Sequence, residues 1–264
     1  MPRIYYLETN NFKRKNSTNF KRFLSVFFVM ILFLGLVLSA SLVTNVLKVN
    51  GLNLGLNLSK SNKNTLKYYL LSLGSYDTFG EAESVSITAT LLGASGYIWE
   101  QDNKYFVLGS VYATNENAKS VQNNFDNTEY KTEVLPVKIS FTKVLNEKFS
   151  KEQKEKITDT IAFLKRVCDS LIENSIKLDK KEISYIIASN NLNNLKSDLV
   201  EYKNNFEYFF DDKIESIINF KTAILKIESL LDKTVNSLIQ NDSVNYNIKN
   251  CLCGVVRYCY EIDK

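Results

Sequence analysis

The chain has 264 residues, which is enough for more than one domain, and its apolar content of 45% argues against intrinsic disorder. It contains no histidine, which excludes Ser-His-Asp and Cys-His nucleophiles, histidine–metal ligation and imidazole acid–base chemistry. The net charge of +4 is local, because residues 1–22 hold six bases and one acid, whereas the remainder holds 27 bases and 28 acids. A nearly neutral body gives no reason to expect a nucleic-acid partner.

The first recognisable element is an uncharged apolar stretch of 22 residues, 23–44, long enough to cross a bilayer as a helix. We predict a transmembrane helix over residues 23–47. All six bases of the tail 1–22 precede it, so the positive-inside rule places this tail in the cytoplasm and the body outside the cell membrane. A cleaved signal peptide is the alternative, since Leu38-Ser-Ala40 offers small residues of the right kind. Both interpretations predict export of the body.

Residues 48–64 are predicted to form a linker. This segment contains three bases and no acids, which suits an anionic membrane surface. Leucine alternates with other residues from Leu52 to Leu58, so the segment is either an extended stalk or a short strand that packs on a neighbour.

A duplicated unit follows in residues 65–141. Each copy consists of an apolar strand, a Gly-Ser break, a threonine that can cap a helix, and a helix that carries alanine. The first copy reads Tyr69-Leu-Leu-Ser-Leu-Gly-Ser-Tyr76 and Thr78-Phe-Gly-Glu-Ala-Glu-Ser84, and the second reads Tyr105-Phe-Val-Leu-Gly-Ser-Val-Tyr112 and Thr114-Asn-Glu-Asn-Ala-Lys-Ser120. Two such units, each closed by a further strand, predict a βαββαβ layer.

The elements of this layer can be placed from turn and capping residues. We expect strands at 68–73, 97–100, 104–108 and 130–139, and helices at 78–92 and 114–125. Gln101-Asp-Asn103 supplies the turn of a hairpin, and Pro136 suggests that the last strand lies at an edge or carries a bulge.

The two helices are expected to cover one face of the sheet and leave the other face open. Strand alternation, counted back from the glycines, assigns Leu71, Leu73, Phe106 and Leu108 to the core. The open face is then predicted to carry Tyr68, Leu70, Ser72, Tyr105 and Val107.

The repeat resembles a SPOR (sporulation-related repeat) domain. The residues that carry the resemblance are Tyr69-Leu-Leu-Ser-Leu-Gly-Ser-Tyr76 with Glu81-Ala-Glu83, and Lys104-Tyr-Phe-Val-Leu-Gly109 with Glu116-Asn-Ala118. The whole arrangement is similar to stage II sporulation protein B-like proteins of endospore-forming Firmicutes. The resemblance implies binding of peptidoglycan glycan strands, stripped of their stem peptides, through the open face.

Aromatic rings on that face would suit the apolar faces of sugars. The glycan-binding residues predicted on this basis are Tyr68, Ser72, Tyr97, Trp99, Tyr105 and Val107. Without the resemblance, the same aromatic residues would be interpreted as core or cross-strand pairs. A further alternative is that the C-terminal helices dock on this face and hide it from a glycan. Where the family often has glutamine and arginine, this chain has Ser72 and either Tyr105 or Val107.

Residues 142–264 are predicted to form an all-α bundle of three long helices and one shorter one. No proline or glycine occurs between Val137 and Cys253, and apolar residues recur at helical spacing. Capping-box pairs divide the region at Ser150/Gln153, Asp179/Glu182 and Asp212/Glu215. The apolar stripes are Ile157, Ile161, Leu164, Cys168 and Leu171; Leu192, Leu195, Leu199, Tyr202, Phe206 and Phe209; Ile217, Phe220, Ile224, Ile227 and Leu231; and Val244, Ile248, Leu252, Val255 and Cys259.

The four cysteines are best interpreted as small core residues. Cys251 and Cys253 would point their sulfurs about 200° apart on a helix, which disfavours a shared metal ion. A disulfide between Cys168 and a cysteine of the last helix is the alternative in an exported protein. The acidic pairs Glu81/Glu83 and Asp211/Asp212 are interpreted as solvated helix starts, so we predict no catalytic site, no metal and no cofactor.

The sequence therefore predicts an α+β protein that is not an enzyme. The leading hypothesis is a single-pass membrane protein that binds denuded glycan during sporulation or cell division at the septum. The alternative is a membrane-tethered scaffold whose SPOR-like layer no longer binds glycan, and whose helical bundle binds a protein partner or itself.

Overall fold

The structure, a computed structural model, describes residues 65–125, 130–211, 213–239 and 245–264. The predicted tail, membrane helix and linker lie outside these ranges. Within them, none of the helices combines the length and the apolar character that crossing a bilayer requires. Ser61–Lys264 forms one compact unit.

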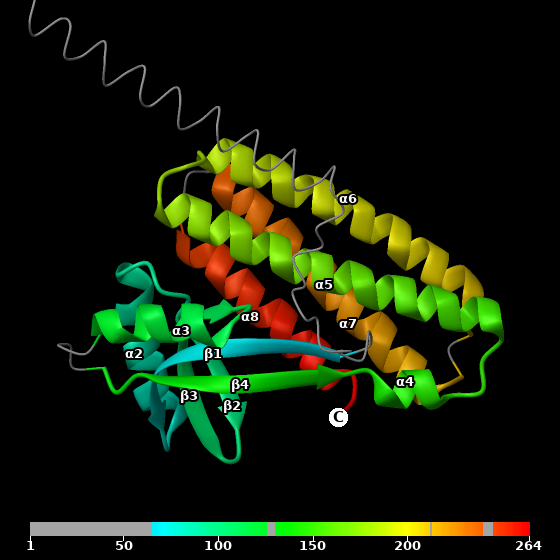
Figure 1. Ribbon diagram of the computed structural model, residues 1–264, viewed down its shortest axis with the longest axis horizontal. Coiled ribbons are helices and arrows are strands. Elements are labelled where there is room, and N and C mark those ends of the chain that lie inside the picture. Colours follow the sequence, from blue (N-terminus) through cyan, green and yellow to red (C-terminus); the bar gives the residue numbers. More distant parts are fainter. Residues whose placement is uncertain (1–64, 126–129, 212, 240–244) are drawn as a thin grey trace, which may run out of the picture. The chain divides into compact units, whose positions relative to one another are not determined.

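The first half of this unit is a four-stranded antiparallel sheet with helices, as predicted (Figure 1). The strand order is β2-β3-β1-β4, so the first strand lies between the third and the fourth. β4 lies at an edge, as Pro136 suggested. The elements in chain order are β1 (Thr65–Tyr76), α2 (Phe79–Leu91), β2 (Tyr97–Gln101), β3 (Lys104–Tyr112), α3 (Asn115–Gln122), the 3-10 turn η1 (Asn123–Phe125) and β4 (Glu133–Ser140).

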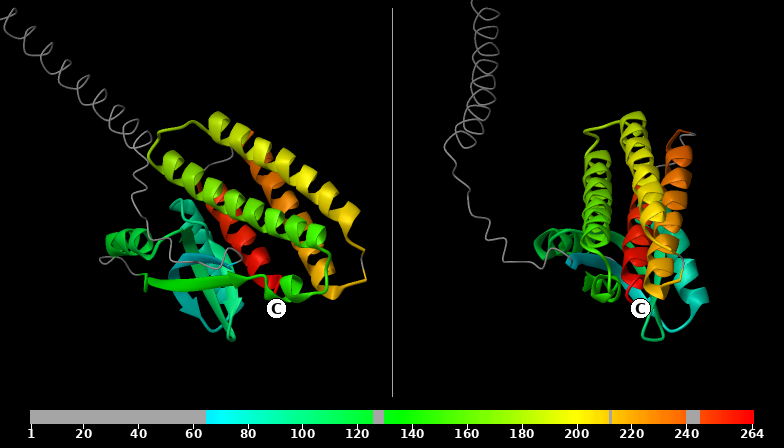
Figure 2. Two further views of the ribbon diagram at one scale, coloured as in Figure 1. Left: turned by 45° about the vertical axis from the view of Figure 1, so that its right-hand side comes forward. Right: turned by 90° about the vertical axis from the view of Figure 1, so that its right-hand side faces the viewer.

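The second half is helical. It comprises α4 (Thr142–Asn146), α5 (Lys151–Asp179), α6 (Tyr185–Phe209), α7 (Glu215–Ile239) and α8 (Asn245–Glu261). α6 packs on α5 and α7, whereas α8 packs on α5, on α7 and on the sheet (Figure 2). The protein is thus a mixed α/β structure in which a small sheet is followed by a helical region.

Short-range signals explain where most of the elements begin. The Thr78 and Thr114 hydroxyls accept hydrogen bonds from the Glu81 and Asn117 amides and so cap α2 and α3, as predicted. Asp102 and Asn103 both adopt positive φ, which gives the β2–β3 hairpin the tight turn that matches strand twist. The predicted capping box of Ser150 and Gln153 is also confirmed at the start of α5.

One predicted helix start is wrong. Asp179 with Glu182 does not begin a helix, because α5 continues through Asp179. α6 begins after Ser184, whose hydroxyl accepts a hydrogen bond from the Ile187 amide. Asp212, the third predicted start, lies outside the described residues.

The predicted apolar stripes form the core. Every residue of the α5 stripe and of the α7 stripe is buried. In α6, Leu192, Leu195, Leu199 and Phe206 are buried, and Tyr202 and Phe209 pack partly buried against them. Of the last stripe, Val244 lies outside the described residues and the rest are buried.

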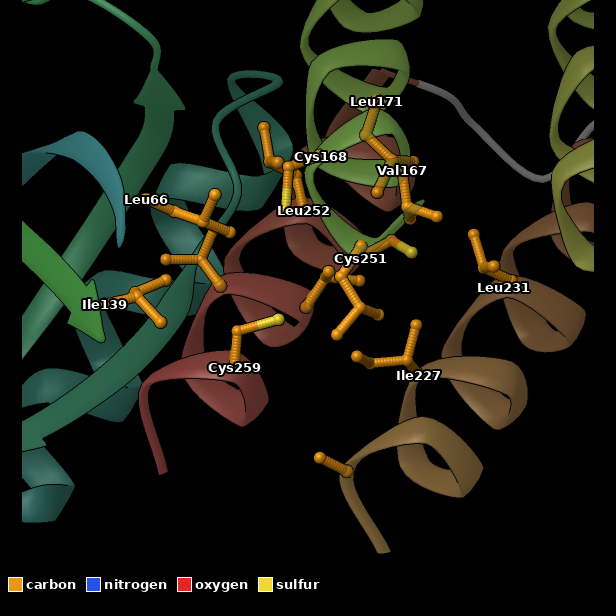
Figure 3. Close-up of a cluster of buried hydrophobic side chains, with 14 of the residues drawn as sticks. Leu66, Ile139, Val167, Cys168, Leu171, Ile227, Leu231, Cys251, Leu252 and Cys259 are labelled. Carbon is orange, nitrogen blue, oxygen red and sulfur yellow. The ribbon is translucent and has the colours of Figure 1, made fainter. Parts of the chain in front are cut away.

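α8 occupies the centre of the unit. Its buried residues lie on all sides of the helix: Ile248, Cys251, Leu252, Cys253, Gly254, Val255, Val256 and Cys259. A helix that is apolar all round belongs in an interior. Figure 3 shows Leu252 and Cys259 of α8 between Leu66 and Ile139 of the sheet and Cys168 of α5. One hydrophobic core therefore runs from the sheet through α8 into the other helices.

The predicted domain boundary after residue 141 falls between β4 and α4, inside this compact unit. Asp263 connects the two sides of that boundary. Its carboxylate accepts hydrogen bonds from the Ser140 hydroxyl (2.6 Å) and from the backbone amides of Thr142 (2.7 Å) and Lys143 (2.9 Å). It therefore satisfies amides at the start of α4, whose N-cap residue, Phe141, provides no side-chain hydrogen bond.

The shared core predicts that the sheet does not fold alone. A fragment of residues 65–141 would expose Leu66, Tyr68, Leu70 and Trp99, which are at most 3% exposed in the whole unit. We expect this fragment to lack near-ultraviolet circular dichroism and a cooperative thermal transition, and residues 61–264 to show both. Cooperative unfolding of the short fragment would contradict the assignment of one core.

Gly254 allows α8 its close approach to α7. A Cβ at this position would lie 2.6 Å from Leu230 Cδ1 and 3.6 Å from Tyr97 Cε2. We expect Gly254→Val to lower the free energy of unfolding by about 1–3 kcal/mol, measured by urea denaturation, because it overpacks the core. Gly80→Val in α2 is the matched control, since a Cβ there meets nothing within 4 Å. Equal losses in the two variants would show that the packing at Gly254 is not special.

Candidate functional site

The face of the sheet predicted to bind glycan is covered by helices. We call the face turned toward α5 and α8 the inner face, and the face that carries α2 and α3 the outer face. Tyr68, Ser72 and Trp99 lie on the inner side and are 2%, 0% and 1% exposed, respectively. The expectation that these residues stand on an open face is therefore wrong. The structure instead has the C-terminal helices docked there, which the sequence had left as an alternative.

Trp99 is covered by side chains of α8. The Arg257 guanidinium lies 4.9 Å from the centroid of its ring, and the Tyr260 ring centroid lies 5.5 Å away. Arg257 also donates a hydrogen bond to the Glu100 carbonyl oxygen at 2.8 Å. A sugar ring that stacked on Trp99 would therefore have to displace protein groups.

The loop before β2 is bound to the start of α8. The Lys249 ammonium donates to the Gly93 carbonyl oxygen (2.8 Å), and the Asn250 amide donates to the Ser95 carbonyl oxygen (3.1 Å). The Ser95 hydroxyl lies 3.3 Å from Cys253 Sγ. These polar contacts fix α8 along the sheet at a definite register.

Two of the predicted residues lie on the opposite face. Val107 is buried and Tyr105 half-buried, and both contribute to the smaller apolar cluster beneath α2 on the outer side. Strand alternation predicts Phe106 and Leu108 on the face covered by α2 and α3, but both lie on the inner face, toward α5 and α8. The cause is the irregular pairing of β1 with β3, whose register shifts between Leu71 and Gly74. Each shift reverses the side-chain alternation of one strand relative to the other.

The remaining predicted residues have structural roles. The Ser72 hydroxyl donates to the Gly74 carbonyl oxygen (3.0 Å) and accepts from the Gly74 amide (3.2 Å), so it stabilises the bulge. Burial raises the pKa of Tyr68 far above its ordinary value of 10.0, and burial likewise raises that of Tyr97, which is half-buried. Both phenols are therefore neutral hydroxyls, with no tendency to act as bases.

The cysteines are free, buried thiols. Burial raises the pKa of Cys251 and of Cys253 to about 12. Contact with Cys168 and burial raise the pKa of Cys259 well above its ordinary value. A thiol that stays protonated and dry is a poor nucleophile and a poor metal ligand. Among the described residues, no group of three or more acidic or cysteine side chains is arranged to hold a metal ion.

A cavity that the sequence did not predict lies on the outer face. It has a volume of about 320 Å³ and is lined by Leu71, Leu73 and Gly109 of the sheet, by residues of α2 and α3, and by the end of α5. At one end of the cavity, Lys249 forms an ion pair with Asp179. Burial, and secondly the negative charge of Asp179, raise the pKa of Tyr112, which also lines the cavity, to about 12. No periodicity signals such a gap, because it depends on how far apart the two helices sit.

An exposed apolar patch adjoins this cavity at the end of α2. Ile87, Leu91 and Leu92 are 59%, 82% and 72% exposed, and Leu92 also lines the cavity. Three such side chains within two turns of one helix form a surface suited to contact with another protein. The acidic residues Glu81 and Glu83 of the same helix are exposed, in agreement with their interpretation as a solvated helix start.

Comparison with known protein families, with curated proteins and with solved structures finds no match to this chain. The class of molecule is therefore defined by its own fold: a small antiparallel sheet whose inner face is closed by helices.

Thiol chemistry tests this description of the site. We expect all four cysteines to stay unmodified by iodoacetamide at about pH 8 in the native protein, because all four are buried away from the reagent. All four should react once guanidinium has unfolded the chain. Mass spectrometry counts the modified residues, and fast labelling of any cysteine in the native state would contradict its burial.

The same thiols predict loss of stability in alkali. The folded-state pKa of Cys251 and of Cys253, about 12, lies above the ordinary value of 9.0, so the unfolded chain loses these protons first as the pH rises. Their contribution to stability is present below pH 9.0 and declines toward pH 12. We expect the urea midpoint to fall over this range, and to fall less in a Cys251→Ala/Cys253→Ala variant. An equal fall in both proteins would contradict the prediction.

Proposed function

We propose that the protein is a non-enzymatic, membrane-tethered scaffold whose SPOR-like layer supports the helices and does not bind glycan. The observation that carries this proposal is the cover on the inner face of the sheet. Trp99 and Tyr68 are buried beneath α5 and α8, and the Arg257 guanidinium lies over the Trp99 ring on which a sugar would stack. The sheet thus provides the apolar surface on which the C-terminal helices pack.

The membrane tether in this proposal comes from the sequence. Residues 23–44 are uncharged and apolar, and all six bases of the tail precede them. The body would then be held outside the cell membrane with its N-terminus in the cytoplasm. A role in sporulation or in division at the septum rests on the resemblance to stage II sporulation protein B-like proteins.

Denuded glycan binding is the competing proposal, and the geometry gives it less support. It would require α8 to leave the sheet, because Tyr68, Ser72 and Trp99 are at most 2% exposed on the inner face. Val107 is buried on the other face, beneath α2. Removing α8 would break the contact of Arg257 with Glu100 and of Asn250 with Ser95, besides exposing the core. The free energy lost by exposing this core and breaking these hydrogen bonds exceeds the free energy of a weak sugar contact.

A protein partner fits the surface that remains. The patch of Ile87, Leu91 and Leu92 lies beside a cavity large enough for an apolar side chain. A partner that inserted such a side chain would also bury the patch, and the burial of this apolar surface would stabilise the complex. The exposed apolar residues of α6 are Ile186 and Ile187 near its start and Tyr208 near its end, so they are too far apart to form one patch of three.

Cosedimentation with peptidoglycan tests the proposal. The full chain in mild detergent would be mixed with sacculi, either untreated or treated with an amidase that removes stem peptides. We expect the same low retention on both, because the sheet offers no exposed glycan-binding face. An established denuded-glycan-binding domain serves as the positive control.

Retention that rises after amidase treatment would contradict the proposal. Two variants would then locate the contact: Tyr97→Ala, at the half-buried edge of the inner face, and Tyr208→Ala, which removes a tyrosine that is 85% exposed on α6. Loss of retention in the first variant alone would establish glycan binding by the predicted surface.

A further inference from the structure

Two lysines face each other on the outer side of the sheet. Lys67 of β1 and Lys138 of β4 are directly paired in the ladder, and both are exposed. Like charges placed directly opposite on neighbouring strands destabilise a sheet. Their neighbours along the strands, Leu66 and Ile139, are buried on the inner face, so the pairing is fixed by the core.

The described residues offer these lysines no counter-charge. Neither forms an ion pair with any acidic group in the part of the chain that the structure describes; Lys67 instead lies 5.5 Å from the centroid of the Tyr69 ring. Glu133, the acid of β4 itself, lies at the other end of that strand. The Asp263 carboxylate, at the near end, is already engaged by the Ser140 hydroxyl and two backbone amides. Positive charge is therefore left exposed on this part of the outer face.

The groups around the two lysines are of a kind found at membrane–water interfaces. Tyr69 is paired with Pro136 across the same strands, and it is half-buried while Pro136 is exposed. We define the basic sheet patch as Lys67, Tyr69, Pro136 and Lys138. A tyrosine beside lysines presents an apolar body, a polar tip and positive charge on one surface.

We propose that the basic sheet patch docks on the anionic phospholipid headgroups of a bilayer. This inference rests on the membrane tether of the proposed function. Thr65, the first residue of β1, lies two positions before Lys67, and only residues 45–64 separate it from the uncharged apolar stretch. That short segment carries three bases and no acids, so the positive charge of the patch continues along the chain toward the bilayer.

The contact is expected to be electrostatic and modest. A lysine near an anionic bilayer contributes about a fivefold gain in association, and the gain is screened by salt. Two lysines on a body that is already tethered are then enough to select one orientation, because the tether supplies a high local concentration. The outer face would turn toward the lipid, and α6 and α7, on the inner side of the sheet, would turn away from it.

Amine labelling of the reconstituted full chain tests this inference. The protein would be placed in liposomes of phosphatidylcholine, with or without about 30 mol% phosphatidylglycerol, and acylated with a membrane-impermeant succinimidyl ester. Mass spectrometry would follow each lysine. We expect Lys67 and Lys138 to react about fivefold more slowly in the anionic liposomes, and the difference to vanish in about 0.5 M salt.

The chain provides matched controls. Lys233 is an exposed lysine of α7 and should react equally in both lipids. Lys138→Gln should restore fast labelling of Lys67 in anionic liposomes, whereas Lys233→Gln should leave the protection of Lys67 unchanged. Equal labelling of Lys67 and Lys138 in the two lipids would overturn the inference, as would equal protection by soluble polyphosphate in zwitterionic liposomes.

Alkaline extraction separates this inference from the proposed tether. If the chain stays in the membrane but its lysines show no lipid-dependent protection, the patch is overturned and the tether stands. If the chain is extracted but protection still requires phosphatidylglycerol, the tether is overturned and lipid recognition by the patch stands.

Discussion

The burial of α8 against the inner face of the sheet is the contact on which the rest of the structure depends. The inner face of this sheet carries Leu66, Tyr68, Leu70 and Trp99, and a face so apolar must be covered. α8 can do this because its middle, residues 251–256, is small or apolar and buried on every side, and because Gly254 lets it lie close to Leu230 and Tyr97. Its small cysteine side chains fit the same narrow space. Aromatic residues that resemble a sugar-binding surface thereby become core residues, and four thiols become inert.

Polar contacts at the two ends of α8 give this packing its register. At the start, Lys249 and Asn250 bind carbonyl oxygens of the loop before β2. Toward the end, Arg257 stacks on Trp99 and binds the Glu100 carbonyl, and Asp263 just beyond the helix binds the start of α4. Apolar contact alone is tolerant of sliding, whereas these hydrogen bonds are satisfied at one position only. The sheet and the helices therefore behave as one body.

Much of this fold is predictable from the sequence, since it depends on local chemistry. Thr78, Thr114 and Ser150 cap helices where their spacing indicates, and the stripes of α5 and α7 are buried as their periodicity requires. The assignment of faces failed because a register shift near Ser72 reverses alternation, and alternation cannot reveal an extra residue. One feature of the sequence does indicate that the inner face is covered. Cys251 to Val256 form an unbroken run of small and apolar residues, which is typical of a helix buried on every side.

The position of α8 in the chain also determines when the sheet can be completed. Ser95 contacts Cys253 across 158 residues, so the inner face gains its cover only after α5, α6 and α7 have been made. Contacts of such long range carry a large loop-closure entropy and slow the search for the native state. During synthesis the strands present Trp99 and their aromatic neighbours to solvent, as an apolar surface open to misassociation. The order of the elements along the chain therefore makes the apolar inner face the last part of the sheet to be closed.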